Sequence, residues 1–203
     1  MNQMQDSPEV KDSPGANDSS EVKEPSEVKD SAEAQNAPQV GDPPAARVHP
    51  RFAKPQRIAF VQSAWHRDVI EECRLAFLAE IEQRGIEPAR IDLFEVPGSF
   101  EIPLHVQLLA KTRRYTAIVA AGLVIDDEYV AETVIRALME VQLRTEVPVF
   151  SAVLTPQQFH ETAAHYDFFR KHFATKGVEV AEACANTLLS LERLRGQVAA
   201  GIV

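Results

Sequence analysis

The sequence predicts an α/β fold in which a doubly wound parallel sheet of four strands is covered by helices on both faces. Two observations lead to this fold class. Four short apolar runs alternate with regions of helical periodicity, and strands joined by helices in this way form parallel sheets through right-handed crossovers. The run TAIVAAGLVI, residues 116–125, is also apolar on both of its alternating faces, as expected of a central strand that is buried on both sides.

The first crossover has the clearest helical pattern. The strand RIAFVQ, residues 57–62, precedes a helix expected over 66–85, and Gly85 supplies a C-terminal stop. Apolar residues three and four positions apart place one stripe on the face that should pack against the sheet. The residues of this stripe are Val69, Ile70, Cys73, Phe77 and Ile81.

The second and third crossovers are shorter. Residues 89–96 predict the second strand, and a helix over 100–112 follows it. Pro103 lies near the first turn of that helix, where a missing N–H is tolerated. The central strand then leads into a helix expected at about 128–144.

The chain ends with one more strand and further helical sequence. VPVFSAVL, residues 147–154, predicts the fourth strand. Two helices are expected after it, at about 156–173 and 178–195, with Gly177 as the break between them, because glycine is unfavourable inside a helix.

The acidity of the chain is concentrated in its first segment. Residues 1–45 contain ten acidic residues and three lysines, a net charge of −7 against −9 for all 203 residues. We expect a disordered acidic tail rich in Pro, Ser and Glu over 1–54, and one folded domain over 55–203. Nucleic-acid binding requires a concentrated basic face, so no nucleic-acid partner is expected.

Other features favour a cytoplasmic protein without a membrane partner. The N-terminus has no basic segment followed by an apolar one, and no apolar run is long enough to cross a bilayer. The isolated cysteines, Cys73 and Cys184, are expected as small core residues. In HETAAH, His160 and His165 lie about 140° apart around a helix, so they cannot share a face as zinc ligands. Neither a metal nor a cofactor is expected.

The fold class places a ligand site at the carboxyl ends of the strands. Four distant segments should meet there: Ser63–His66, Pro97–Glu101, Leu123–Glu128 and Thr155–His160. Trp65 is the only tryptophan, and it either stacks on a planar heterocycle or packs on the core. Glu101 starts a helix, where a carboxylate either gains from the dipole or accepts hydrogen bonds from ligand hydroxyls. His66 is equally a helix-start residue or a catalytic one.

The third of these segments is acidic throughout its short crossover. Asp126, Asp127 and Glu128 stand where the central strand meets the next helix. Acidic residues there stabilise the N-terminus of a helix, but they also repel a phosphate dianion. A phosphate site at this crossover is therefore in conflict with its own charges.

Several motifs together resemble the lumazine synthase family. They are VPGSFEIP (96–103), the strand–helix pair around LVID, and VPVFSAVLTPQQF followed by KGVEVAEA. The resemblance covers roughly residues 57 to 195, and tryptophan followed by histidine after the first strand is similar to the second paralogue type of some bacteria. It implies a flavodoxin-like fold. It also implies a transferase of riboflavin biosynthesis that condenses 5-amino-6-(D-ribitylamino)uracil with 3,4-dihydroxy-2-butanone 4-phosphate.

The resemblance also implies substrate-binding roles. Trp65 matches the aromatic residue that stacks on the pyrimidine, and Glu101 matches the acceptor for the ribityl hydroxyls. Ser151 stands where the family has an aromatic residue from the adjacent subunit, and His165 where it has a phosphate-binding arginine. The other matched residues hold the ribityl chain or the pyrimidine edge, and they are Ser99, Phe100, Leu123, Val124 and Ile125.

One departure leaves the activity open. The family has a phosphate loop and a catalytic histidine between the third strand and its helix, but here about five residues are missing and the histidine slot falls near Asp127. The chain is therefore a working synthase with a rearranged phosphate site, an impaired relative that binds ribityl-pyrimidine or flavin ligands or acts as an oligomeric scaffold, or an unrelated flavodoxin-like binding module. Family membership implies a homo-oligomer, either a pentamer or a larger assembly such as a decamer.

Overall fold

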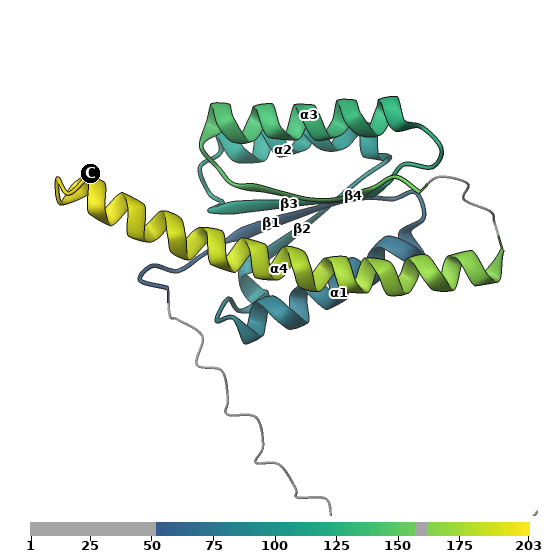
Figure 1. The fold of residues 1–203 in the computed structure, drawn as a ribbon, viewed down its shortest axis with the longest axis horizontal. Helices are drawn as coiled ribbons and strands as arrows, with labels where there is room; N and C mark the ends of the chain where they lie inside the picture. Colours follow the sequence, from purple (N-terminus) through teal and green to yellow (C-terminus); the bar gives the residue numbers. More distant parts are fainter. Residues whose placement is uncertain (1–51, 157–161) are drawn as a thin grey trace, which may run out of the picture. The chain divides into compact units, whose positions relative to one another are not determined.

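The computed structural model describes residues 52–156 and 162–203. Four parallel strands form one sheet with the order β2-β1-β3-β4, so β2 and β4 are its edges (Figure 1). This order confirms the predicted doubly wound α/β sheet. The strands are β1 (Ile58–Ser63), β2 (Ile91–Val96), β3 (Ala117–Leu123) and β4 (Val149–Leu154).

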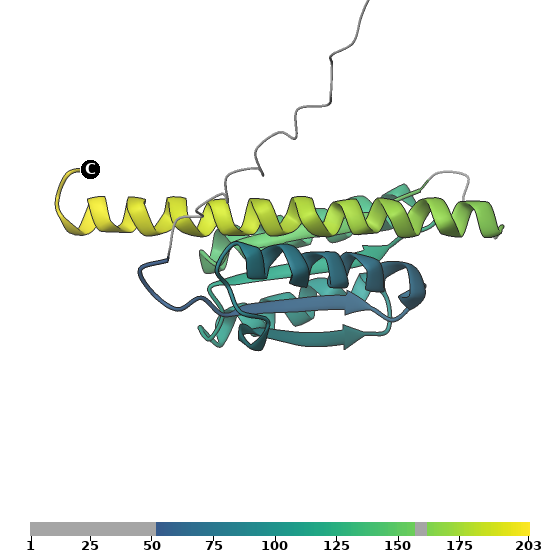
Figure 2. The ribbon, with the colours of Figure 1, turned by 90° about the horizontal axis from the view of Figure 1, so that it is seen from below.

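Helices cover both faces of the sheet, as predicted (Figures 1 and 2). On one face lie α1 (Arg67–Gln83) and α4 (Ala163–Ala199), and on the other lie α2 (Ile102–Lys111) and α3 (Glu128–Thr145). Two short 3₁₀ turns, η1 (Pro88–Arg90) and η2 (Ser99–Glu101), precede β2 and α2. Pro103 occupies the first turn of α2, where the sequence placed it.

The sheet has a separate hydrophobic core on each side because strand side chains alternate between faces. Ile58 and Phe60 of β1 pack toward α1 and α4, whereas Ala59 and Val61 pack toward α2 and α3. Every residue of β1 and of β3 is buried, which confirms that these are the central strands. Because the two strands pair in parallel, their carboxyl ends lie side by side at one rim of the sheet.

The α1 helix matches its predicted pattern. Its buried residues are the five of the apolar stripe from Val69 to Ile81. Gly85 follows with φ 88°, a left-handed conformation that glycine adopts without steric cost.

Cys73 and Cys184 are buried free thiols, and burial raises the pKa of Cys73 to about 12. Both cysteines are thus core residues.

The predicted break at Gly177 is wrong, because α4 runs continuously from Ala163 to Ala199. Gly177 is buried at the contact between α4 and α1. A Cβ atom at this position would collide with the carbonyl oxygen of Cys73 and would lie 2.9 Å from Cβ of Ala76. The glycine therefore permits two helices to approach closely, and this packing outweighs its low helix propensity.

A polar network joins the amino ends of the strands, at the edge of the sheet opposite the rim. Arg57 Nη2 donates to Asp92 Oδ1 at 2.7 Å, and the Tyr115 hydroxyl donates to Asp92 Oδ2 at 2.7 Å. The hydrogen bonds from Tyr115 and Arg57 lower the pKa of the Asp92 carboxyl below its usual value, against the opposing effect of burial. This network ties β1, β2 and the start of β3 together.

Within the described residues, no helix has the length and apolar character needed to span a membrane.

Candidate active site

A cleft of about 460 Å³ lies at the carboxyl ends of β1, β2 and β3. We call it the rim cleft. Its lining comes from three chain segments, 65–66, 97–101 and 123–130. These correspond to three of the four segments that the fold class predicted to meet there. The fourth segment reaches His160, which lies outside the described residues.

The turn between β1 and α1 contributes an exposed aromatic side chain. Trp65 lines the rim cleft and is 73% exposed. An indole so accessible does not pack in the core, and its face is open to a planar ligand. The backbone of the turn is fixed by a hydrogen bond of 2.8 Å from the Ala64 N–H to the Val96 carbonyl.

His66 is the second residue of this turn that lines the rim cleft. Its backbone has φ 54° and ψ 40°, and its carbonyl accepts hydrogen bonds from the N–H groups of Val69 and Ile70 at 2.9 and 3.1 Å. His66 is therefore the N-cap position of α1. A non-glycine residue in this left-handed conformation is strained by roughly 1 kcal/mol or more, so the surrounding contacts must hold it there.

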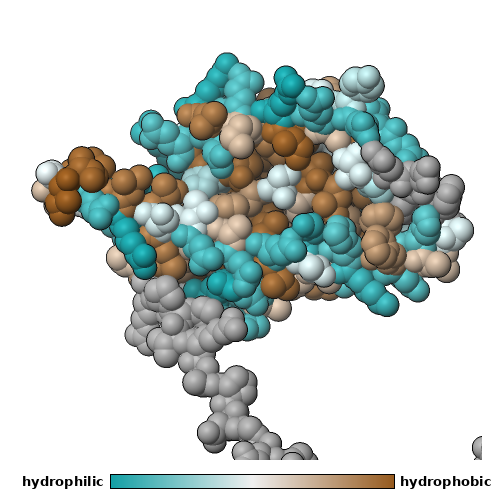
Figure 3. Space-filling view, in the orientation of Figure 1, coloured by the Kyte–Doolittle hydropathy of each residue, from teal (hydrophilic) through white to brown (hydrophobic). Residues whose placement is uncertain are grey.

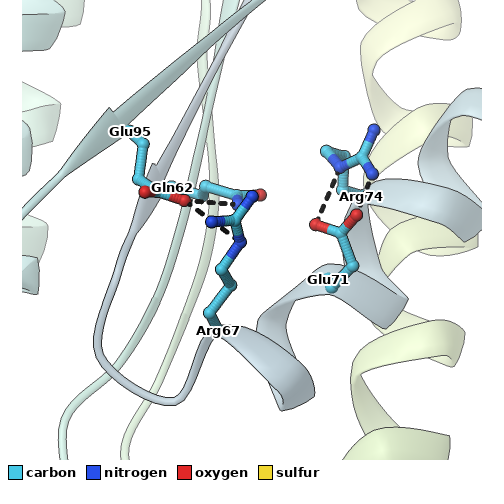
Figure 4. Close-up of polar contacts among 5 residues, drawn as sticks. All are labelled: Gln62, Arg67, Glu71, Arg74 and Glu95. Atoms are coloured by element: carbon cyan, nitrogen blue, oxygen red, sulfur yellow. Dashed lines mark hydrogen bonds and ion pairs between the residues drawn. The ribbon is translucent and has the colours of Figure 1, made fainter.

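Two ion pairs anchor the residues that follow His66. Arg67 Nε lies 3.4 Å from Glu95 Oε2 on β2, and Gln62 Nε2 donates to the same oxygen at 3.4 Å (Figure 4). On the other side, Arg170 Nη2 of α4 donates to Asp68 Oδ2 at 2.8 Å. The start of α1 is thus attached to the neighbouring strand and to the long helix, although exposed ion pairs contribute little stability individually.

The turn between β2 and α2 forms the second wall. Phe100 and Glu101 line the rim cleft with exposed side chains, whereas Ser99 is buried. The Ser99 hydroxyl donates to the Leu123 carbonyl at 3.3 Å. A Cβ at Gly122 would lie 2.5 Å from that hydroxyl, so a glycine in β3 lets the η2 turn approach the strand closely.

Glu101 is folded back over its own turn. A Cβ at Gly98 would lie 2.9 Å from Glu101 Oε2, so Gly98 leaves space for the carboxylate. The carboxylate is presented in the same cleft as Trp65. The arrangement offers an aromatic face and a hydrogen-bond acceptor to one ligand.

The end of β3 forms the floor. Leu123, Val124 and Ile125 all line the rim cleft. The Val124 N–H donates to the Leu154 carbonyl at 2.9 Å, and the Leu123 carbonyl accepts from Ser99. Parts of this peptide edge are therefore already used within the chain.

The acidic crossover closes the cleft. Asp126 has φ 52°, and its N–H donates to the Pro156 carbonyl at 3.3 Å. Asp127 is the N-cap of α3, and its Oδ1 accepts from the Val130 N–H at 2.9 Å. Asp127 and Val130 line the cleft as well. The carboxylate occupies the helix N-terminus, where backbone N–H groups otherwise bind phosphate.

The described lining of the rim cleft contains no lysine or arginine. Arg170, the cation paired with Asp68, lies beside the β1–α1 turn. Arg136 pairs with Glu132 on the exposed side of α3. Neither residue lines the cleft within this chain.

Two predicted site residues lie away from the rim cleft. Ser151 is an exposed residue of β4, the edge strand, and His165 lies in the first turn of α4. The His165 N–H donates to Thr162 Oγ1, the cap of that helix, at 3.4 Å. The cleft thus brings together seven of the nine predicted residues. Sequence reasoning did not single out Val130, which enters the lining because it lies one helical turn after the cap.

Comparison with known proteins agrees with this architecture. Residues 55–192 match the family model described as 6,7-dimethyl-8-ribityllumazine synthase. A protein of Bradyrhizobium diazoefficiens named 6,7-dimethyl-8-ribityllumazine synthase 2 is 76% identical over 79% of this chain and 99% of its own length. A protein of the same name from Rhodopseudomonas palustris is 68% identical over 81% of this chain and 93% of its own length.

A third relative is more distant. The protein named 6,7-dimethyl-8-ribityllumazine synthase 2 in Pseudomonas syringae pv. tomato is 51% identical over 69% of this chain and 85% of its own length. The family match and these three relatives confirm the resemblance seen in VPGSFEIP and the neighbouring motifs. The chain therefore belongs to the 6,7-dimethyl-8-ribityllumazine synthase family, an enzyme family of riboflavin biosynthesis, and is of its second type.

Proposed function

We propose that this chain condenses 5-amino-6-(D-ribitylamino)uracil with 3,4-dihydroxy-2-butanone 4-phosphate, and that the condensation takes place in the rim cleft. The observation that supports this most strongly is the convergence of Trp65, Glu101 and the peptide edge 123–125 on one cleft of about 460 Å³. The matched relatives carry the synthase name, which favours the enzyme over an impaired relative.

In this proposal, the pyrimidine ring lies between Trp65 and the end of β3. The indole is exposed toward the cleft, and stacking of a base on an aromatic side chain is worth about 1–3 kcal/mol. The apolar side chains of Leu123 and Val124 form the floor beneath it. The ribityl arm then extends toward the η2 turn, where Glu101 accepts hydrogen bonds from its hydroxyls and Phe100 covers its carbon chain.

The main task of the protein in this reaction is to hold the two substrates together. The amine of the pyrimidine forms an imine with the ketone of the second substrate, phosphate is eliminated, and the ring closes. Correct positioning of two reactants supplies about 7–11 kcal/mol of the barrier. A cleft that fixes the pyrimidine beside the ketone therefore accelerates the reaction without a covalent enzyme intermediate.

The second substrate is held with the help of a neighbouring copy. Ser151 on the edge strand β4 and His165 on α4 lie outside the chain's own cleft, as expected of residues that complete the site of an adjacent subunit. The N-terminus of α4 also favours an anion through its dipole. We place the phosphate group there.

Exposed apolar side chains support the homo-oligomer. Ile135, Met139 and Leu143 form an exposed stripe along α3, spaced four residues apart. Figure 3 shows apolar side chains gathered between α3 and α4, on the face that includes the β4 edge. Contiguous apolar surface of this kind marks interfaces. We propose that the enzyme is a cytoplasmic homo-oligomer built from pentamers, either as a single pentamer or as a decamer.

The rate of lumazine formation tests the proposed function. The purified full-length chain is mixed with both substrates, and the fluorescence of the product is followed against the spontaneous reaction. The proposal predicts formation well above that background. Binding of the ribityl-pyrimidine without acceleration identifies the impaired relative instead, and the absence of binding contradicts the assignment of the cleft.

A further inference from the structure

The rim cleft contains only a few ionisable side chains. Among its described lining residues, these are His66, Glu101 and Asp127. Asp127 caps α3 through Oδ1, and Glu101 lies over Gly98 on the ribityl side of the proposed site. His66 is the imidazole of this set, and an imidazole both accepts and donates a proton close to neutral pH.

The position of His66 is fixed by its backbone. The left-handed conformation at φ 54° is uncommon for a histidine, and two N–H groups of α1 hold its carbonyl. Strained backbone of this kind persists only where the surrounding structure imposes it, and it clusters at functional sites. Four described non-glycine residues have positive φ, and His66 and Asp126 are the two at the rim.

The surroundings of the imidazole are also defined. Its ring centroid lies 6.2 Å from that of Tyr166 on α4, with the rings tilted by 46°. The residues that follow it are attached to β2 by the Arg67–Glu95 ion pair (Figure 4) and to α4 by the Asp68–Arg170 ion pair. His66 therefore stands between the start of α4 and the cleft, directly after the indole of Trp65.

We propose that His66 transfers protons during imine formation in the rim cleft. The inference rests on the proposed function. The amine nitrogen of the pyrimidine forms a bond to the ketone carbon as the C=O π bond breaks, and the imidazole carries the first of the two amine protons to the oxygen, which becomes a hydroxyl. The imidazole then takes the second proton from the nitrogen and gives it to the hydroxyl, which leaves as water as the C=N bond forms. His66 ends in its initial protonation state.

The His66→Asn variant tests this role. Asparagine adopts the left-handed conformation readily, so the turn that carries Trp65 is preserved, but its amide cannot exchange protons. We expect kcat for lumazine formation to fall about 10²-fold or more. The affinity for 5-amino-6-(D-ribitylamino)uracil, followed by Trp65 fluorescence, should change less than about threefold. His172→Asn on α4 is the matched control, and its rate should equal that of the wild type.

Chemical rescue separates catalysis from structure. Glycine also accepts the left-handed conformation, and His66→Gly leaves space beside the cleft. Added imidazole should restore part of the lost rate in His66→Gly and have no effect on the wild type. If His66 had only a structural role, added imidazole would not restore the rate of the His66→Gly variant.

The two proposals fail in different ways. A wild-type chain that does not exceed the spontaneous rate overturns the proposed function and the inference with it. A wild-type chain that accelerates the reaction, combined with a His66→Asn variant of equal kcat, overturns the inference alone. Loss of pyrimidine affinity in His66→Asn together with no imidazole rescue also overturns it, because His66 then supports the turn only.

Discussion

Asp127 Oδ1 accepts a hydrogen bond of 2.9 Å from the Val130 N–H, so the acidic crossover after β3 is the cap of α3. This relationship resolves the conflict seen in the sequence. The carboxylate of Asp127 occupies the helix N-terminus that a phosphate would otherwise use. We therefore expect the phosphate of the second substrate to bind elsewhere.

The Asp127→Ala variant should lose this cap. Substitution of an N-cap Asp by Ala costs about 1 kcal/mol, and the midpoint of urea unfolding reports the loss. Asp127→Asn is the control, since asparagine caps a helix about as well as aspartate does. If both variants unfold at the wild-type midpoint, the cap does not contribute as described.

The affinity for the pyrimidine should depend on Trp65 far more than on Asp127. Trp65→Ala removes the stacking face, and we expect 5-amino-6-(D-ribitylamino)uracil to bind about 10-fold or more weaker. Asp127→Ala should leave the affinity nearly unchanged. Calorimetric titration measures both constants, and equal losses in the two variants would contradict the placement of the pyrimidine.

Gly177 should be essential to the packing of α4 on α1. In Gly177→Ala, the new methyl group meets the Cys73 carbonyl and Ala76, and overpacking of this kind costs about 1–3 kcal/mol. A Cβ at Gly196, in the same helix, meets nothing within 4 Å. Gly196→Ala should therefore be neutral or slightly stabilising. Thermal unfolding of the two variants makes the comparison, and similar destabilisation in both would refute the close approach.

The Asp92 network should make stability depend on pH. The folded state lowers the pKa of Asp92, so its stabilisation is present above the unfolded pKa of about 3.9. It is lost as the pH falls through the folded pKa. Asp92→Asn should be less stable than the wild type at neutral pH, and the difference should shrink as the pH approaches about 3. Urea midpoints across this range test it, and a constant difference would exclude the linkage.

The fold was largely predictable from the sequence because its strands are short apolar runs and its first helix carries a regular apolar stripe. The five apolar residues from Val69 to Ile81 specify a buried face without knowledge of any partner. The sequence wrongly predicts a helix break at Gly177, because local propensity does not show that another helix packs against this position. The contact between Ser99 and Gly122 is equally invisible, since it joins residues 23 positions apart through the geometry of the sheet.

The site was readable in part for a related reason. The topology alone places the ends of β1, β2 and β3 at one rim, so the sequence is sufficient to group Trp65, Glu101 and residues 123–125. The cap formed by Asp127 depends on side-chain orientation, which the sequence restricts but does not determine. The roles proposed for Ser151 and His165 depend on a neighbouring copy.

Trp65 gives the most direct test of the rim cleft, because it is the only tryptophan in the chain and its emission reports on the cleft. Titration of the full-length protein with 5-amino-6-(D-ribitylamino)uracil should change the emission in a saturable way, and Glu101→Gln should raise the apparent Kd. Emission that stays constant while calorimetry registers binding would show that the ligand binds elsewhere and would contradict the account.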